Sequence, residues 1–292
     1  MKTYRESVQN KEISISAELS FPQDSTATDV YRQADALQGI VDGVLVSDNH
    51  WPIAQMSTIA AASLVQERGI DPIASLSCHD RNRIALQSEL IGLRALGVTS
   101  AVLQRGQLGP NEQQLASTAV LDTNGRELVE IANALNEEPG TQASEQFFIG
   151  TTARAFRPDS AWDTDALDAK AKAGAQFLQL HLSFKPDLIR SYVDALVKAK
   201  LTWKYSIIVS LAVLESTKSA LWLKQNIPDS GVPSHWVDRL ESASDPGNEG
   251  VSLCADLIRQ VAEIPGVSGL NLVSMGSPDA VPAAIRASGL RS

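Results

Sequence analysis

Short apolar runs alternate with longer stretches of helical periodicity along almost the whole chain. The short runs are rich in Val, Ile and Leu and stop at polar residues, as buried parallel strands do. Alternation of strands and helices predicts parallel pairing through right-handed crossovers. The predicted strands are residues 13–19, 43–47, 72–77, 98–104, 147–152, 177–183, 205–212 and 269–274. The predicted helices are residues 29–38, 57–67, 83–96, 126–135, 165–173, 186–199, 216–226 and 250–263.

Eight predicted strands are the number that a closed (β/α)8 barrel needs, and 292 residues are a usual length for this TIM-barrel class of α/β fold. Several helices end on a glycine just before the next strand, such as Gly69 and Gly97, where a left-handed cap residue belongs. The chain shows no long Gly/Ser/Pro linker, no low-complexity segment and no repeat beyond the alternation. We therefore expect a single TIM-barrel domain over residues 1–292.

Two predicted loops are longer than the others, residues 108–124 after the fourth strand and residues 227–248 after the seventh. Long loops at the carboxyl ends of barrel strands usually cover a substrate. For the second loop, which contains Trp236, a packed insertion with a short helix at 234–242 is an equally good interpretation.

Composition and charge narrow the class of ligand. A net charge of -9 disfavours nucleic acid and anionic membranes as partners, so small molecules are expected, and a homo-oligomer is compatible with the sequence. Cys78 and Cys254 are too few and too far apart for a disulfide framework. The start of the chain has no apolar signal core, and no apolar run is long enough to span a bilayer. We expect a cytoplasmic protein.

The ends of the predicted strands contain most of the candidate chemistry. The strand that leads into Arg105-Gly106-Gln107 delivers a cation, a residue without a side chain and an amide to the carboxyl face. Glu18 lies within the apolar first strand, where an ionised carboxylate must be paired, neutralised or used, so it is a candidate general acid or a member of a structural ion pair with Arg105 or a lysine.

Other polar residues at strand ends have two interpretations. Asp48 and His50 are candidate bases or ligands, but an Asp-Asn pair at a strand end is also ordinary turn chemistry. Asp80 or Asn82 could serve only as a cap of the helix that follows the third strand. The four histidines show no paired spacing, so we expect no metal site.

Alternation in the sixth strand places Gln179, His181 and Ser183 on one face and leucines on the other. Since such barrels bury leucines against their helices, the polar face is expected to point into the barrel. The chain has no Gly-rich dinucleotide fingerprint, phosphate-binding lysine loop or nucleophile elbow.

Several segments together resemble the methylenetetrahydrofolate reductase family in order and spacing, and the similarity covers nearly the whole chain. They are Glu18 with Phe21-Pro22, Val46-Ser47-Asp48-Asn49, the run from Leu76 to Asn82, Leu103-Gln104-Arg105-Gly106, Lys170 before Ala173-Gly174-Ala175, Ile227-Pro228, the run from Arg259 to Glu263, and Gly266-Val267. The resemblance implies a barrel that binds FAD at its carboxyl face and reduces methylenetetrahydrofolate to methyltetrahydrofolate with NADH or NADPH.

The resemblance also implies roles for individual residues. Glu18 matches the general acid of ring opening, and His181 and Gln107 stand where the substrate is bound. Residues that match cofactor-binding positions are Ser47, Arg105, Gly106, Gln107, Asp163 and Lys170.

Four positions depart from the family pattern. Gln107 replaces an Asp, Ser75 replaces a His, the segment around Arg154 replaces a Tyr-Pro-Glu sequence, and His181 replaces the Gln that contacts the pterin. These departures keep a second class of function open: a barrel without flavin, in which the nicotinamide reduces the folate directly, or a folate-binding or methyl-transferring paralogue without a redox step.

Overall fold

A computed structural model describes residues 2–10, 12–19, 21–49, 54–106, 119–120 and 122–291. In this part of the chain the strands form a closed barrel in which β1 to β8 pair in sequence order, and each pair is parallel. The predicted (β/α)8 barrel is therefore confirmed. The strands are β1 (Ser14–Leu19), β2 (Gly43–Val46), β3 (Pro72–Ser77), β4 (Ser100–Gln104), β5 (Phe148–Ala153), β6 (Phe177–Leu180), β7 (Ser206–Val213) and β8 (Val267–Ser274).

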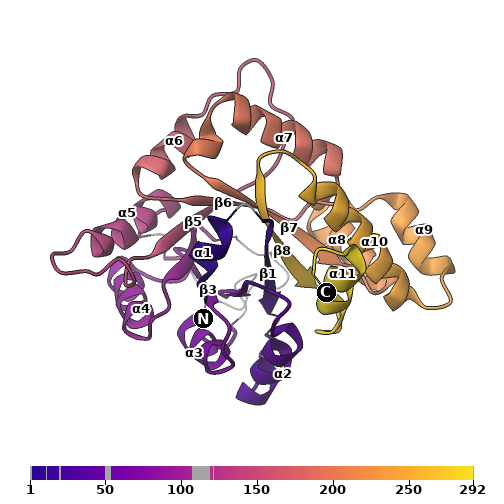
Figure 1. Cartoon of the computed structure of the whole chain (residues 1–292), viewed down its shortest axis with the longest axis horizontal. Helices are drawn as coiled ribbons and strands as arrows, with labels where there is room; N and C mark the ends of the chain where they lie inside the picture. Colours follow the sequence, from indigo (N-terminus) through magenta and orange to yellow (C-terminus); the bar gives the residue numbers. More distant parts are fainter. Residues whose placement is uncertain are drawn as a thin grey trace.

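Helices surround the barrel, and α1 lies across the middle of the ring of strands (Figure 1). The α-helices are α1 (Tyr4–Val8), α2 (Ala27–Leu37), α3 (Thr58–Glu67), α4 (Arg83–Ala95), α5 (Gly125–Asn136), α6 (Asp165–Lys172), α7 (Pro186–Lys198), α8 (Thr217–Asn226), α9 (Ser234–Ser242), α10 (Pro246–Ala262) and α11 (Ala280–Ser288). Two 3-10 turns, η2 (Leu201–Trp203) and η3 (Pro228–Ser230), connect them. Among these helices, none is both long and apolar enough to cross a bilayer.

Most predicted elements agree with the structure to within a few residues, and the larger differences have local causes. The sequence analysis missed α1 and α11, because a five-residue helix and a nine-residue helix containing Pro282 give little periodic signal. Helix α10 begins at Pro246, four residues earlier than predicted, because the Asp245 side chain accepts a hydrogen bond from the Asn248 N–H at 3.0 Å. Strand β6 ends at Leu180.

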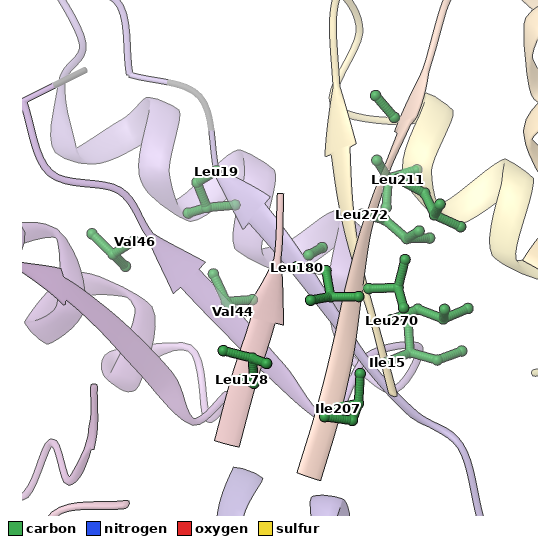
Figure 2. Packing of buried hydrophobic residues seen from close by; sticks show 14 of the residues in the cluster. Ile15, Leu19, Val44, Val46, Leu178, Leu180, Ile207, Leu211, Leu270 and Leu272 are labelled. Atoms are coloured by element: carbon green, nitrogen blue, oxygen red, sulfur yellow. The ribbon is translucent and has the colours of Figure 1, made fainter. Parts of the chain in front are cut away.

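The outward side chains of the strands form the main core with the surrounding helices. Isoleucines, valines and leucines of β1, β2, β6, β7 and β8 line this layer (Figure 2). Leu178 and Leu180 belong to it, so the leucines of β6 face the helices as the alternation predicts.

A second, smaller cluster fills the interior of the barrel near the amino-terminal ends of the strands, and we call this cluster the floor of the barrel. Leu45, Ile73, Val102, Phe148, Phe177 and Ile208 pack there with Tyr4 and Val8 of α1. The rings of Phe148 and Phe177 stack with their centroids 4.7 Å apart, and Tyr4 meets Phe177 edge-on at 6.0 Å. Burial raises the pKa of Tyr4, and a hydrogen bond with Ser16 lowers this pKa by a smaller amount. The Tyr4 hydroxyl in the floor is therefore uncharged. The polar side chains of the barrel interior lie toward the carboxyl ends of the strands.

The two long predicted loops differ in outcome. Residues 108–118 and 121 of the first loop lie outside the described residues. The second contains η3 and α9, and Trp236 of α9 is only 7% exposed and meets Phe184 edge-on at 5.3 Å. The short helix predicted at 234–242 is confirmed, and it packs on the barrel instead of forming a bare loop.

Candidate functional site

Polar side chains replace the apolar floor toward the carboxyl ends of the strands. In most strands they occupy every second position, so they share a face with the residues of the floor. Two pairs bond across neighbouring strands: Gln104 Nε2 donates to Ser75 Oγ at 3.2 Å, and Gln179 Nε2 donates to Ser210 Oγ at 3.3 Å. The upper lumen is therefore polar and internally hydrogen-bonded.

Glu18 is the carboxylate of this polar layer on β1. Its side chain is half-buried, and its Oε2 lies 3.5 Å from Nδ2 of Asn271 on β8. Glu18 also borders a cavity of about 140 Å³ between β1, α2 and the segment after β8, together with Arg32, Ser274 and Gly276. The carboxyl group thus has a buried partner on β8, and the residue lies at the edge of a cavity.

Gly106 follows β4 and lies directly against the end of β3. Its φ is +85°, and a Cβ placed there would stand 2.8 Å from the Cβ of His79 and 3.0 Å from that of Ser77. His79 is only 8% exposed, and its Nε2 has no hydrogen-bond partner among the described residues. Arg105 is exposed beside it, whereas Gln107 lies outside the described residues.

The end of β2 is held by a structural ion pair. Asp48 is 7% exposed, accepts a hydrogen bond from the Ser77 N–H at 2.8 Å and pairs with Arg81. Asp80 pairs with Arg81 at 3.1 Å. Asp48 therefore ties the end of β2 to the end of β3, a structural role that differs from the local turn of the sequence analysis. His50 lies outside the described residues, and Ser47 is half-buried next to Asp48.

Helix α4 begins as its capping residue predicts. Asn82 Oδ1 accepts a hydrogen bond from the Ala85 N–H at 2.9 Å, so the capping interpretation of Asn82 is confirmed.

Lys170 and His181 come together where β5 and β6 end. Lys170 Nζ donates to the Thr152 carbonyl at 3.0 Å, and desolvation lowers the pKa of this half-buried ammonium group. The His181 N–H donates to the Ala153 carbonyl at 2.9 Å, just after β6. Its imidazole is open to solvent, yet desolvation, followed by Arg154 and Lys170, lowers its pKa. A neutral imidazole thus stands near two cations.

Two neighbours of this group are exposed. Arg154 forms an ion pair with Asp229 of η3, which links the end of β5 to the segment after α8. Asp163 precedes α6, where its Oδ1 accepts a hydrogen bond from the Asp165 N–H at 3.1 Å. Asp163 therefore lies on the same segment as Lys170 but is used in a local turn.

Glu215 lies at the barrel mouth between β7 and α8, one strand along from His181. Its carboxylate accepts hydrogen bonds from the Ser277 N–H at 2.8 and 3.0 Å and from Ser274 Oγ at 3.0 Å. A Cβ at Gly276 would stand 2.8 Å from its Oε1. The Glu215 carboxylate therefore already accepts hydrogen bonds from two donors of the loop between β8 and α11.

The sequence analysis missed Asn271, Glu215 and the Arg154–Asp229 pair. Asn271 was detectable, because it is a polar residue flanked by leucines in the eighth predicted strand. The other two are contacts between segments that lie far apart in the sequence, and periodicity gives no signal for such contacts. Among the described residues, no group of three or more His, Cys, Asp or Glu could hold a metal ion.

Comparison with known proteins places these observations in a family context. A model of the methylenetetrahydrofolate reductase family matches residues 3–289. The chain is 23% identical over 243 residues to a probable methylenetetrahydrofolate reductase (NADPH) of Caenorhabditis elegans, covering 80% of this chain and 34% of that protein. The chain thus spans about a third of the length of this curated relative.

A solved structure with the same fold comes from Clostridium thermocellum. It is an uncharacterized protein that binds two copies of 5-methyl-5,6,7,8-tetrahydrofolic acid. The two chains superpose with a TM-score of 0.67 at 15% identity, covering 97% of this chain and 96% of the other. At this identity the likeness shows the common fold.

Proposed function

Because this chain belongs to the methylenetetrahydrofolate reductase family, we propose that it reduces 5,10-methylenetetrahydrofolate to 5-methyltetrahydrofolate, or runs the reverse oxidation, with a nicotinamide as hydride donor. The observation that carries the proposal is Glu18, a half-buried carboxyl group inside the polar end of the barrel, beside a cavity. The folate bound by the Clostridium thermocellum protein of the same fold supports the substrate class.

Glu18 acts as the general acid in this proposal. Protonation of the ring nitrogen that leaves the bridging methylene opens the five-membered ring and produces an iminium ion, which then accepts a hydride at the methylene carbon. A carboxyl group in a partly desolvated position suits this role, because burial disfavours its charged form. In the same proposal, the ring nitrogens of His181 contact the pterin, which its exposure and lowered pKa support.

FAD is the cofactor that the family implies, and several residues fit it. Lys170 offers a partly desolvated cation for a phosphate, and Gly106 leaves the backbone open at a strand end. His79 Nε2 is a buried polar atom without a partner among the residues described. Ser47, Arg105 and Asp163 complete the proposed binding set. When bound, FAD carries the hydride between the nicotinamide and the folate.

A flavin-free reaction is the second candidate, and specific residues favour it. Gln107 and Ser75 lack the carboxylate and imidazole of the family pattern, and Ser75 instead accepts a hydrogen bond from Gln104. Arg154 stands where the family has an aromatic segment and is engaged by Asp229. In this case NADH or NADPH gives its hydride to the folate directly. A folate-binding or methyl-transferring paralogue would need no acid at position 18.

Glu18→Gln tests the proposed role of the acid. The amide keeps the shape and hydrogen bonds of the carboxyl group but supplies no proton, so we expect turnover to be lost while folate affinity stays within a few-fold. Glu12→Gln, an exposed change shortly before β1, is the matched control. Wild-type turnover in Glu18→Gln would contradict the assignment.

The cofactor requires a separate assay. Protein stripped of flavin is assayed with NADH or NADPH and methylenetetrahydrofolate, with and without added FAD. The flavoenzyme proposal expects activity to return with FAD. Full activity in protein shown to contain no flavin, unchanged by FAD, would instead establish direct hydride transfer.

A further inference from the structure

A buried hydrogen-bonded chain leads from β1 through β8 to the Glu18 carboxyl group. Ser16 Oγ donates to Asn271 Oδ1 at 3.0 Å, and Asn271 Nδ2 lies 3.5 Å from Glu18 Oε2. Asn271 is 0% exposed and Ser16 is 1% exposed. Ser16 is the direct register partner of Asn271, and Glu18 lies two residues further along β1 on the same face. The three side chains are therefore fixed by the barrel itself.

The Ser16 hydroxyl meets the acceptor end of the Asn271 amide. An asparagine amide has an acceptor end and a donor end of nearly the same shape, and only its hydrogen-bond partners distinguish them. A hydroxyl proton directed to Oδ1 holds the carbonyl end toward Ser16 and the NH2 end toward Glu18. In the reversed orientation the Asn271 carbonyl oxygen would face Glu18 and repel its ionised carboxylate, so the ionised form favours the observed orientation.

The surroundings restrict Asn271 further. Its neighbours Leu270 and Leu272 on β8 are 0% exposed in the main core, so the strand cannot shift without disturbing the packing around it. Ser16 also bonds to the Leu270 carbonyl at 3.3 Å, which ties the hydroxyl to the backbone of β8. The amide thus has little freedom to move.

We propose that Asn271 is a positioning residue for Glu18, and that Ser16 orients its amide. The Asn271 NH2 group holds one oxygen of the Glu18 carboxyl group toward β8 and so fixes the direction in which the carboxyl group points. The effect on turnover rests on the proposed function, but the effect on the carboxyl group of Glu18 does not. Asn271 and Ser16 themselves touch no reacting atom in this proposal.

The direct test observes the carboxyl group without any reaction. Protein labelled with 13C at the glutamate side-chain carboxyl carbon is studied by NMR, and the Glu18 signal is identified by its loss in Glu18→Gln. We expect Asn271→Leu and Ser16→Ala to move this signal at constant pH. Ser14→Ala is the matched control, because Ser14 is a buried serine on the same strand whose Oγ has no hydrogen-bond partner among the described residues. It should leave the signal in place.

The kinetic test separates positioning from folding. In Ser16→Ala and Asn271→Leu we expect kcat to fall by about tenfold with KM within about threefold, because the ligand still binds while the acid is misplaced. Ser14→Ala should keep both constants. Ser16→Ala serves as the smaller change if Asn271→Leu does not fold.

The outcomes distinguish this inference from the proposed function. If the Glu18 signal moves only in the two test variants but the wild type has no reductase activity, the positioning stands and the proposed function fails. If the signal responds equally in Ser14→Ala and Ser16→Ala, or in neither test variant, the positioning is refuted whatever the enzyme does.

Discussion

Gly106 lies against His79 with no room for a side chain, since a Cβ at position 106 would stand only 2.8 Å from the Cβ of His79. The neighbour is the beginning of a side chain, and its backbone follows directly on β3. It therefore cannot swing away as the tip of a flexible side chain could. The segments that follow β3 and β4 therefore lie in close contact at Gly106 and the Cβ of His79.

Gly106→Ala should destabilise the protein and weaken flavin binding. A positive φ alone costs an L-residue about 1–2 kcal/mol, and the contact with His79 adds to this cost. Gly140→Ala is the control, because its φ is +92° and nothing lies within 4 Å of the added Cβ. Denaturant unfolding should show a larger loss of unfolding free energy at position 106. Equal losses would contradict the close contact.

Lys170→Met should weaken the binding of FAD while the fold is kept. A hydrogen bond that involves a charged group contributes about 1.5–3 kcal/mol, which corresponds to roughly 10-fold to 150-fold in affinity. Lys172→Met, two residues along the same helix and exposed, removes the same charge away from the site. Flavin titration measures the affinity of both variants for FAD. Similar losses of affinity in the two variants would show that Lys170 does not bind the phosphate.

Lys170→Met should also change the pKa of His181 in protein without any ligand. Desolvation, Arg154 and Lys170 lower the pKa of His181, so removal of the Lys170 charge should raise this pKa toward its ordinary value of 6.5. NMR titration of the imidazole measures it. An unchanged titration in Lys170→Met would show that the two groups do not interact.

Stability should depend on pH through His181. Because its pKa is lowered in the folded protein, the unfolded chain binds a proton first as the pH falls below 6.5, and the unfolding free energy then decreases. His181→Gln removes this contribution, so its stability should decline less steeply with acid. Unfolding curves at a series of pH values test the difference, with His235→Gln, an exposed histidine on α9, as control.

His181→Ala should also raise the KM for folate more than it lowers the affinity for the cofactor. The expectation follows from its proposed contact with the pterin. His235→Ala should leave both quantities unchanged. Equal effects of His181→Ala on folate and cofactor would place the imidazole between the two ligands instead.

The barrel was predictable because its strands are continuous apolar runs, and their polar ends predicted where the site lies. The alternation around Gln179 fixed which face of β6 is polar, since the leucines on the other face had to meet helices. The extent of β6 was less predictable, because His181 keeps a backbone hydrogen bond to Ala153 after the strand has ended.

The relationships between residues required the structure. That Asn271 faces Glu18 depends on the register of β1 with β8, which joins the two ends of the sequence. The use of Asp48 for Arg81 depends similarly on how β2 meets the segment after β3. A single sequence contains the residue types but not the partner that each one finds.

The Glu215 carboxylate has a consequence for how a long anionic ligand can lie. Barrels of this class often bind a phosphate with the loops after the seventh and eighth strands. Here the Ser277 N–H and the Ser274 hydroxyl already serve a fixed negative charge, which repels a second one. Lys170, near His181 where β5 and β6 end, is a cation at another part of the rim. A dinucleotide bound at this opening would therefore direct its phosphates away from Glu215 and toward Lys170.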